Sequence, residues 1–371
     1  MKDTFGQSVS ITLAGESHGP AIVTILSGMA PGIPVDEEFI AKQLTKRRPS
    51  GAISTARQEA DKFEILSGVF NGFTTGTPIA ILIRNENTQS KDYSEIAATA
   101  RPGHADFAAN CKYHGFQDYR GGGHFSGRIT AGIVAAGAIC VSALSKKGIK
   151  IGTHIAECAG ISDRKFDKTE ADIDSLNEKL FAVLDEEQGK KMEEAILLAK
   201  SEQDSVGGIL ETAITGIPAG IGEPYFDSIE SQLSHMLFSI PAVKGVEFGS
   251  GFDFAKMRGS EANDSFRIDE NGKVFTRTNH NGGINGGISN GMPVILSHSH
   301  TRSAKNERLC LSLLIFPSFV NFLKNPTAFS ASRRKSAPTG AKTFLFIKFT
   351  TAFTARTTGF AAASSRRLAV R

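Results

Sequence analysis

Hydrophobic and polar residues follow a helical period in five stretches of the chain. These stretches are residues 36–46, 130–147, 170–185, 190–200 and 227–240. Asp36 is a typical N-cap, and Glu230 stands three residues after Asp227, as in a capping box. The stretch before Gly148 is rich in Ala and other apolar residues, which predicts a helix buried in the core.

Strand-like patterns are fewer and shorter. They cover residues 79–83, 209–217 and 243–248. These runs do not alternate regularly with the helices, so a doubly wound parallel sheet is not indicated. The pattern predicts a mixed α and β protein.

Composition narrows the class of protein. The chain has 371 residues, of which 40% are apolar and 22% charged, as in a globular protein of one large or two ordinary domains. Its 4 cysteines show no paired spacing, which argues against a disulfide scaffold and favours a reducing, cytoplasmic location. No basic and apolar leader opens the chain, and no run of about eighteen apolar residues occurs, so we expect neither secretion nor a membrane span.

Charge is distributed unevenly along the chain. Of the 42 Lys and Arg residues, 11 follow Glu307, whereas none of the 38 Asp and Glu residues does. A basic tail of this kind can bind nucleic acid or an anionic membrane surface. The alternative is that the tail does not belong to the fold of the body.

Glycine-rich loops with embedded His and Arg are the unusual feature of the body. They cover residues 15–19, 101–106, 120–124, 204–208 and 281–291. Glycine lets backbone N–H groups approach an anion closely. None of the loops has the Lys-Ser/Thr ending of a Walker A sequence, and Ser126 stands where G-x-G-x-x-G needs its third glycine. ATP chemistry and a Rossmann cofactor site are therefore disfavoured.

Basic side chains gather beside these loops. They are Lys46, Arg47, Arg48, Arg57, Arg101, Arg120 and Arg128. The planar fork of Arg matches carboxylate and phosphate groups, so the cluster favours a pocket for a polyanionic small molecule. The alternative is a set of solvated surface charges.

His18 and His104 stand in polar loops rather than on apolar stripes. A neutral imidazole can donate or accept a proton near pH 7, which suits acid–base chemistry, although a single His is more often structural. We expect no metal site, because these histidines lack metal-ligand spacing and His298-Ser299-His300 stands at the edge of the basic tail. Ser17 fits the nucleophile elbow G-x-S-x-G only loosely, which leaves a hydrolase as an alternative.

Several motifs occur together in one order. They include Gly15-Glu16-Ser17-His18-Gly19, Lys46-Arg47-Arg48-Pro49, Arg101-Pro102-Gly103-His104-Ala105-Asp106, Tyr119-Arg120-Gly121-Gly122-Gly123, Asp204-Ser205-Val206-Gly207-Gly208 and the segment 283–291. In this order they resemble the chorismate synthase family, over about residues 5–294. The resemblance implies an α+β fold with a helical core sandwiched between antiparallel β-sheets, and a homotetramer.

The same resemblance implies a shikimate-pathway lyase. The enzyme would convert 5-enolpyruvylshikimate 3-phosphate to chorismate by anti-1,4-elimination, with reduced FMN and no net redox change. NADPH serves some relatives as the reductant of the flavin. We expect the substrate, 5-enolpyruvylshikimate 3-phosphate, as the partner, and neither nucleic acid nor a membrane.

Roles for single residues also follow from the resemblance. His18 would be the acid that assists phosphate departure, His104 would protonate the reduced flavin, and Ser17 would contact the substrate. The substrate anions would be bound by Arg47, Arg48 and Arg128, and Arg47 also matches the position associated with NADPH. Flavin contacts would come from His124, Phe125, Ser126 and Gly286, although most relatives have Arg-Ser-Ser in place of the first three.

The family pattern ends after Val294. We therefore expect a chorismate synthase-like domain over 1–294 and a basic tail over 295–371, which lacks the Lys-Pro-Thr-Pro-Ser and Arg-His-Asp-Pro motifs of relatives. A reading-frame shift near codon 295 would change composition and motifs together; a genuine divergent or disordered tail is the alternative. Two other functions remain open at this point: a flavin oxidoreductase with a net redox product, and a protein that binds nucleic acid through the tail.

Overall fold

The computed structural model describes residues 3–48, 53, 60–86 and 99–301. All of these belong to one compact unit, residues 1–330. The basic tail predicted from residue 295 onwards lies almost entirely outside the described residues.

The first half of the chain forms a five-stranded antiparallel sheet. Its strands lie in the order β1 (Thr4–Gly6), β2 (Ser10–Ala14), β3 (Ala21–Ser27), β7 (Ile79–Arg84) and β4 (Phe63–Ser67). Alternate residues of β7, beginning at Ile79, are completely buried, as expected for a strand with one face on a core. The predicted strand 79–83 is confirmed and extends by one residue.

A second five-stranded antiparallel sheet follows. Its strands lie in the order β11 (Val243–Phe248), β16 (Val294–His300), β10 (Gly208–Thr215), β8 (Lys150–Cys158) and β9 (Ile161–Ser162). The structure confirms the predicted strand 243–248 as β11. The strand predicted over 209–217 is β10, which begins at Gly208 and ends at Thr215.

Strand β16 corrects the predicted domain boundary. It begins at Val294 and pairs with β10 on one side and β11 on the other. Residues 295–300 are thus an interior part of the second sheet and do not belong to a separate tail.

Three short hairpins complete the strands of the described chain. They are β5 (Val69–Phe70) with β6 (Phe73–Thr74), β12 (Phe266–Ile268) with β13 (Val274–Thr276), and β14 (Ile284–Asn285) with β15 (Ile288–Ser289).

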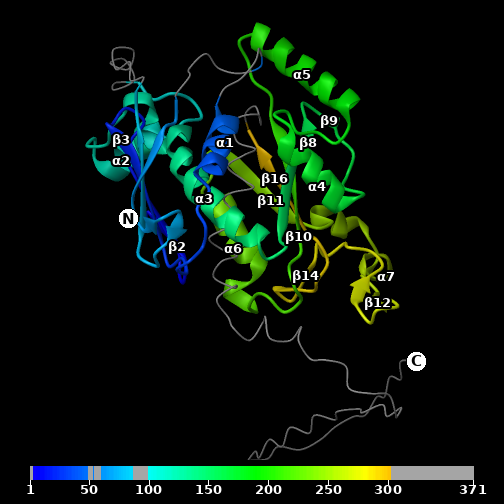
Figure 1. The fold of residues 1–371 in the computed structure, drawn as a ribbon. Helices are drawn as coiled ribbons and strands as arrows, with labels where there is room; N and C mark the ends of the chain where they lie inside the picture. Colours follow the sequence, from blue (N-terminus) through cyan, green and yellow to red (C-terminus); the bar gives the residue numbers. More distant parts are fainter. Residues whose placement is uncertain (1–2, 49–52, 54–59, 87–98, 302–371) are drawn as a thin grey trace, which may run out of the picture. The chain divides into compact units, whose positions relative to one another are not determined.

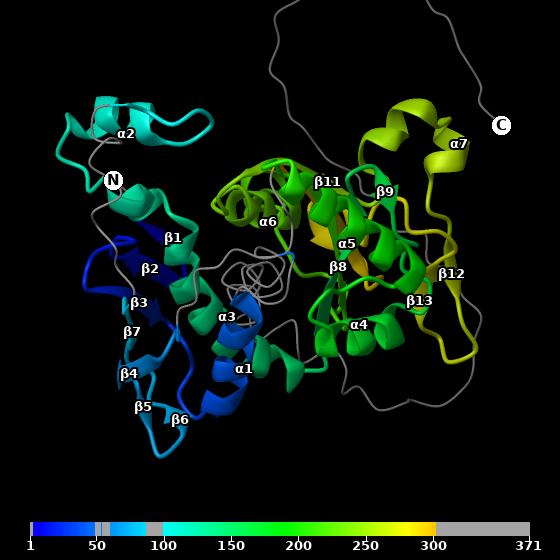
Figure 2. The same ribbon diagram turned by 90° about the horizontal axis from the view of Figure 1, so that it is seen from above.

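Helices lie between the two sheets (Figures 1 and 2). They are α1 (Glu37–Arg47), α3 (Thr130–Ser145) and α6 (Ile229–Leu237). Helix α3 packs on the inner face of the first sheet, where a side chain at Gly132 would collide with Thr24. The expected α+β sandwich with a helical core is confirmed.

Helix α3 is buried on nearly all sides. With the turn before it (127–145), it is the one described helix long and apolar enough to cross a membrane, yet 78% of its most apolar window is buried within the protein. This burial is typical of a core helix, as its composition predicted.

Two helices cover the other face of the second sheet. They are α4 (Thr169–Glu178) and α5 (Glu186–Ser201), and the close fit of α4 is visible at Gly152, where a Cβ would lie 2.9 Å from Ile173. The prediction of one helix over 170–185 is wrong at its end, because the Asp185 carboxylate caps α5 by accepting from the N–H groups of Glu187 and Gln188.

A similar correction applies at α6. Its N-cap is Ser228 rather than Asp227, since the Ser228 hydroxyl accepts from the backbone N–H of Ser231. Shorter helices that the sequence did not predict are α2 (Asp106–Tyr113), η2 (Arg120–Phe125), η3 (Gly127–Ile129), η4 (Tyr225–Asp227), η5 (Gly251–Lys256) and α7 (Gly259–Ala262).

Candidate active site

Two of the predicted glycine loops pack directly on each other. The backbone N–H of Ser17 donates to the carbonyl of Gly123 at 3.0 Å. Gly121 has a φ of 59°, and a Cβ at this position would overlap the ring of His18 and lie 2.9 Å from the hydroxyl of Ser17. Glycine is thus required both for the backbone conformation and for the space that His18 occupies.

Ser17 and His18 are both buried beneath this contact, at 0% and 7% exposure. The Ser17 hydroxyl is shielded from water and has no hydrogen-bond partner among the described residues. Buried polar groups are nearly always paired in folded proteins. An unpaired hydroxyl beside a buried imidazole therefore points to a ligand as the missing partner.

Arg47 and Arg128 meet at a shared carboxylate. Asp61 accepts a hydrogen bond from Arg47 through Oδ2 at 3.0 Å and one from Arg128 through Oδ1. The Asp61 side chain is fully buried, and those of Arg47 and Arg128 are 13% and 4% exposed. Two guanidinium groups on one carboxylate leave the cluster with one net positive charge, which suits an anionic ligand.

Asn85 ties this cluster to the His18 loop. Its side-chain carbonyl accepts from Nε of Arg128 at 2.9 Å, while its amide nitrogen donates to the carbonyls of Glu16 and Gly19. Neither Asp61 nor Asn85 was predicted as a site residue. No local pattern marks either one, since Asp61 follows Gln58, Glu59 and Ala60, and Asn85 is a single amide after Arg84.

The remaining predicted basic residues do not form one cluster. Arg48 follows the last residue of α1 and donates to the carbonyl of Ala60, whereas Lys46 donates to the carbonyl of Asn177 next to the end of α4. Arg57 lies outside the described residues.

Two of the arginines pair with neighbouring carboxylates. Arg101 makes a two-pronged pair with Asp106, with both hydrogen bonds at 2.9 Å, and Arg120 pairs likewise with Asp118 at 2.8 Å. The hydrogen bond from Arg101 holds the pKa of Asp106 at about 2.

A cavity of about 700 Å³ brings the other predicted residues together. His104, His124, Phe125 and Ser126 line it, with apolar side chains from β1, β2 and α3 and with residues 235–244. Among the described residues that line it, Lys244 is the one Lys or Arg. A mainly apolar cavity of this size, with a few polar groups, fits a planar heterocyclic cofactor.

Both cavity histidines have a defined tautomer when neutral. Nδ1 of His104 lies 3.1 Å from the carbonyl oxygen of Pro102, and Nδ1 of His124 lies 2.8 Å from that of Gly15. A carbonyl oxygen only accepts, so the proton is on Nδ1 in each case. Nε2 is then the basic nitrogen that can take up a proton.

Ser126 and Gly286, the two other predicted flavin contacts, have different surroundings from the two histidines. The Ser126 hydroxyl accepts from the N–H of Arg128 at 3.3 Å and so caps η3. Gly286 lies in the exposed turn between β14 and β15, whose hairpin packs on residues 221–229, and it does not line the cavity. Within one chain the structure therefore does not bring Gly286 to the other site residues.

Among the described residues, no three His, Cys, Asp or Glu side chains lie close enough to hold a metal ion. His298 and His300 are 1% and 4% exposed and lie on the inner face of β16, with ring centroids 4.9 Å apart. The His-Ser-His pattern thus places two imidazoles inside the core.

The sequence is similar to those of known proteins. The family model described as chorismate synthase matches residues 9–303. The chain is 48% identical to the chorismate synthase of Pyrococcus abyssi over 290 residues, which cover 78% of this chain and 80% of the relative. It is 47% identical to that of Lachnoclostridium phytofermentans over 308 residues, with 82% and 83% covered.

A solved structure agrees with these relatives. A crystal structure of chorismate synthase superposes with a TM-score of 0.68 at 28% identity, covering 86% of this chain and 91% of the other. The family match includes every loop that places Ser17, His18, Arg47 and Arg128 together, and it extends past the predicted limit at 294 through β16. The chain therefore belongs to the chorismate synthase family.

Proposed function

We propose that this chain catalyses the 1,4-elimination that converts 5-enolpyruvylshikimate 3-phosphate to chorismate and phosphate. The observation that supports this most directly is the buried group formed by Ser17, His18, Arg47 and Arg128. The substrate carries two carboxylates and a phosphate, and the group combines cationic guanidinium groups with a hydroxyl and an imidazole.

The proposed reaction breaks two bonds of the substrate. The bond from C3 to the phosphate oxygen breaks with its electron pair on oxygen. C6 loses its hydrogen as a proton to a base, and the electron pair of that C–H bond enters the ring, which ends with two double bonds. Arg47 and Arg128 would stabilise the charge on the departing phosphate, because their guanidinium groups are held in place before the substrate arrives. His18 would supply a proton to the phosphate oxygen, and the Ser17 hydroxyl would hydrogen-bond to the substrate.

We further propose that reduced FMN occupies the cavity of about 700 Å³. When bound, reduced FMN would lend electron density to the substrate without net oxidation. Phe125 and the apolar side chains of α3 would contact its ring system, while Nε2 of His104 would hold or transfer a proton at its edge. NADPH is the proposed source of the reducing equivalents, with a separate reductase as the alternative.

An anaerobic assay tests this function. Photoreduced FMN, substrate and the full chain are expected to release phosphate and chorismate in equal amounts without consuming the flavin. His18→Gln is expected to lower the rate by roughly 10²–10⁴-fold, whereas Lys256→Ala, on an exposed pair, is the matched control. Stoichiometric loss of reduced flavin would instead identify an oxidoreductase.

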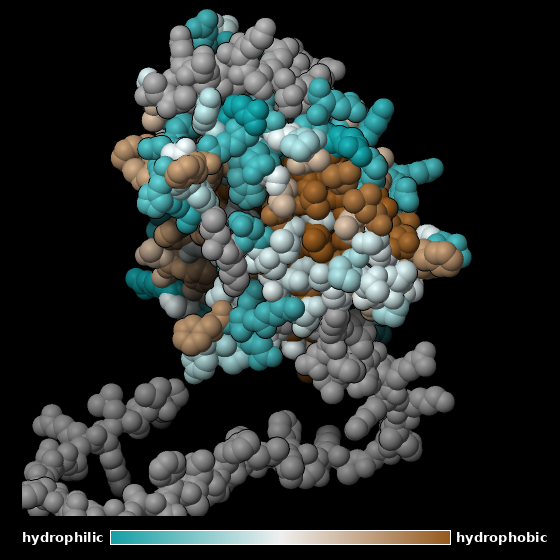
Figure 3. Space-filling model, turned by 90° about the vertical axis from the view of Figure 1, so that its left-hand side faces the viewer, coloured by the Kyte–Doolittle hydropathy of each residue, from teal (hydrophilic) through white to brown (hydrophobic). Residues whose placement is uncertain are grey.

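We also propose a homotetramer, in which the first sheet contributes an interface. Its outer face carries Val23, Ile25, Ala80 and Leu82 on adjacent strands, and Ile25 is 37% exposed. Figure 3 shows apolar surface on this side of the molecule. Contiguous apolar surface of this kind is typical of subunit interfaces. Light scattering on the full chain and on Ile25→Asp tests it: a tetramer that dissociates in the variant is expected.

A cytoplasmic location is part of the same proposal. Cys111, Cys140 and Cys158 are free thiols in the structure, which is consistent with a reducing compartment.

For the tail, we propose a reading-frame shift after residue 303. The sequence alone suggested codon 295, but β16 continues the second sheet to residue 300 and the family match runs to residue 303. No acidic residue follows Glu307. Sequencing the gene across codons 295–310 in independent clones tests the idea, and an unbroken frame in all of them would reject it. If the tail is genuine, we expect much weaker elimination than in full-length relatives.

A further inference from the structure

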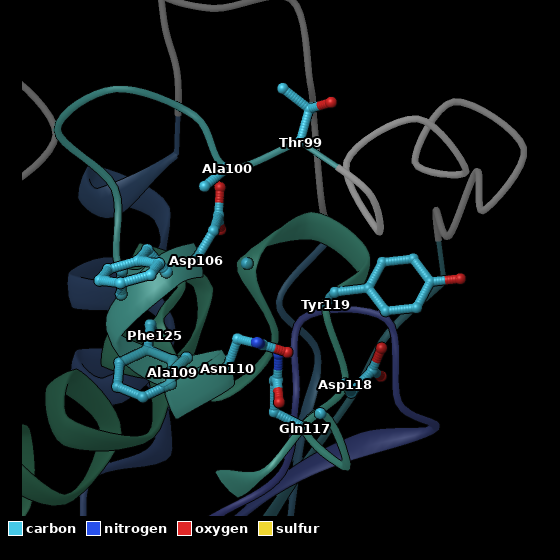
Figure 4. Close-up of a pocket in the computed structure, with 13 residues that line it drawn as sticks. Thr99, Ala100, Asp106, Ala109, Asn110, Gln117, Asp118, Tyr119 and Phe125 are labelled. Atoms are coloured by element: carbon cyan, nitrogen blue, oxygen red, sulfur yellow. The ribbon is translucent and has the colours of Figure 1, made fainter. Parts of the chain in front are cut away.

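The loop that carries His104 is closed by one carboxylate. Asp106, the first residue of α2, accepts from the backbone N–H of Arg101 at 3.0 Å and from Nε and Nη2 of the same residue, both at 2.9 Å. Figure 4 shows the Asp106 carboxylate reaching back from the start of the helix towards Ala100, the residue before Arg101. Three hydrogen bonds to one residue therefore join the two ends of the loop.

His104 is attached to the same end of this loop. Its backbone N–H donates to the carbonyl of Arg101 at 3.3 Å, and its Nδ1 lies 3.1 Å from the carbonyl oxygen of Pro102. Residues 102–104 are exposed, so packing contributes little to fixing the ring. The position of the imidazole therefore depends on the loop being held closed.

His104 and Asp106 line different cavities. His104 lines the cavity of about 700 Å³ that we propose for the flavin, whereas Asp106 lines a second cavity of about 310 Å³, together with Asn110 and Tyr119 (Figure 4). Ala105 stands between the two residues and lines both cavities. Any effect of Asp106 on chemistry in the larger cavity must therefore pass through the loop.

The Asp106 carboxylate serves the loop and does not cap its own helix. Acidic and other polar side chains at the start of a helix commonly accept from the free N–H groups of the first turn. Here the N-cap is Ala105, which makes no side-chain cap, and Asp106 accepts from Arg101. A local departure of this kind, in which a helix start lacks its cap while the loop before it is tied, is typical of functional sites.

The ion pair of Arg101 and Asp106 is partly shielded from water. The two side chains are 28% and 14% exposed. The hydrogen bond from Arg101 is the main cause that lowers the pKa of Asp106 from 3.8 to about 2, and the charge of His104 is a smaller cause. The carboxylate is therefore ionised at neutral pH, and a two-pronged pair fixes direction as well as distance.

We propose that Asp106 is a positioning residue for the elimination: its two-pronged pair with Arg101 keeps the loop 101–106 closed and the His104 imidazole at the wall of the proposed flavin cavity. This role rests on the proposed function, in which His104 holds or transfers a proton at the edge of the flavin. A displacement of about 1 Å can slow such a reaction by roughly 10²-fold, even when the change lies away from the reacting atoms.

Steady-state kinetics with photoreduced FMN test this role. Asp106→Asn is expected to lower kcat by roughly 10–100-fold and to change KM for the substrate by less than about twofold. In a His104→Ala background the same substitution should lower kcat no further, because Asp106 acts only through His104. Asp174→Asn, which breaks an exposed pair with Lys150, is the matched control and should leave kcat unchanged in both backgrounds.

Hydrogen exchange followed by mass spectrometry tests the loop without flavin or substrate. In Asp106→Asn the amides of Arg101 and His104 are expected to exchange faster, whereas those of α3 should keep their protection. Arg101→Gln breaks the same pair from its other side, and it keeps the test decisive if Asp106→Asn does not fold.

Unchanged exchange of the loop in Asp106→Asn and Arg101→Gln would overturn the proposal. An unchanged kcat would do the same, and so would an equal fall in kcat with and without His104, which would indicate a general structural role. Because exchange is measured on the chain alone, failure of this proposal is distinguishable from an absence of lyase activity.

Discussion

The carboxylate of Asp61 contacts the guanidinium of Arg128 where both side chains are closed off from water, at 0% and 4% exposure. The same carboxylate also holds Arg47. Removing one member of a buried ion pair leaves the other charge uncompensated, which is much more costly than breaking a pair at the surface.

We therefore expect Asp61→Asn to lower the free energy of unfolding by about 3–5 kcal/mol. It should also raise KM for the substrate more than it lowers kcat, because Arg47 and Arg128 lose the group that positions them. Urea unfolding and steady-state kinetics measure the two effects. Asp253→Asn, which breaks an exposed pair with Lys256, is the control and should change stability by less than about 1 kcal/mol.

Gly121→Ala tests the space reserved for His18. Two effects are expected: about 1–2 kcal/mol of backbone strain at a φ of 59°, and displacement of the His18 ring by the new Cβ. Gly72→Ala separates them, because Gly72 has a φ of 76° and open space where its Cβ would lie. The backbone strain should be shared, whereas lyase activity should fall only in Gly121→Ala. Equal activity in the two variants would contradict the role given to His18.

His298 should make the second sheet sensitive to acid. Burial, and the charge of His300 as a smaller cause, lower its pKa from 6.5 to about 3. Because the pKa is lowered, the folded state favours the neutral imidazole. The contribution of His298 to stability is therefore complete above about pH 6.5 and is lost as the pH falls towards 3. In His298→Val the loss of stability between these pH values should be smaller, as measured by urea unfolding at a series of pH values.

His154, on the opposite face of the same sheet, should show the reverse dependence. Burial lowers its pKa, but hydrogen bonds from its two ring nitrogens to Asp163 at 2.8 Å and Glu211 at 3.0 Å raise it above 6.5 overall. Its contribution to stability is then complete below 6.5 and is lost as pH rises through the raised value. The difference in unfolding free energy between the original chain and His154→Gln should shrink towards alkaline pH. A difference that grows with pH would show that the ring is neutral in the fold.

The elements that the sequence predicted well share a physical cause. Helix α1 has a side-chain cap at Asp36 and a charged outer face, and β11 carries two valines and a phenylalanine, which favour a strand, so local chemistry decides both. Strands β2, β3 and β8 were not predicted, since their pairing depends on partners far away in the sequence. The limits of α4 and α6 were misplaced because a competing cap, Asp185 or Ser228, is recognised only from its hydrogen bonds.

The site residues also fall into those that a local sequence pattern identified and those that it did not. Glycine-rich loops identified Ser17, His18 and Arg128, because few other residues allow such close backbone contacts. Asp61 and Asn85 were missed, since one carboxylate and one amide in ordinary surroundings carry no local pattern. Only the folded chain shows that both of them hold the same guanidinium.

The position of β16 has a consequence for how the protein is made. It is the last strand of the described chain, yet it lies between β11 and β10, which are synthesised earlier. Until residue 300 has left the ribosome, both of those strands keep an open hydrogen-bonding edge, and such edges favour association with other chains. Completion of the second sheet must therefore wait until nearly the whole folded unit has been translated, and chains interrupted before β16 should be clients of chaperones and proteases.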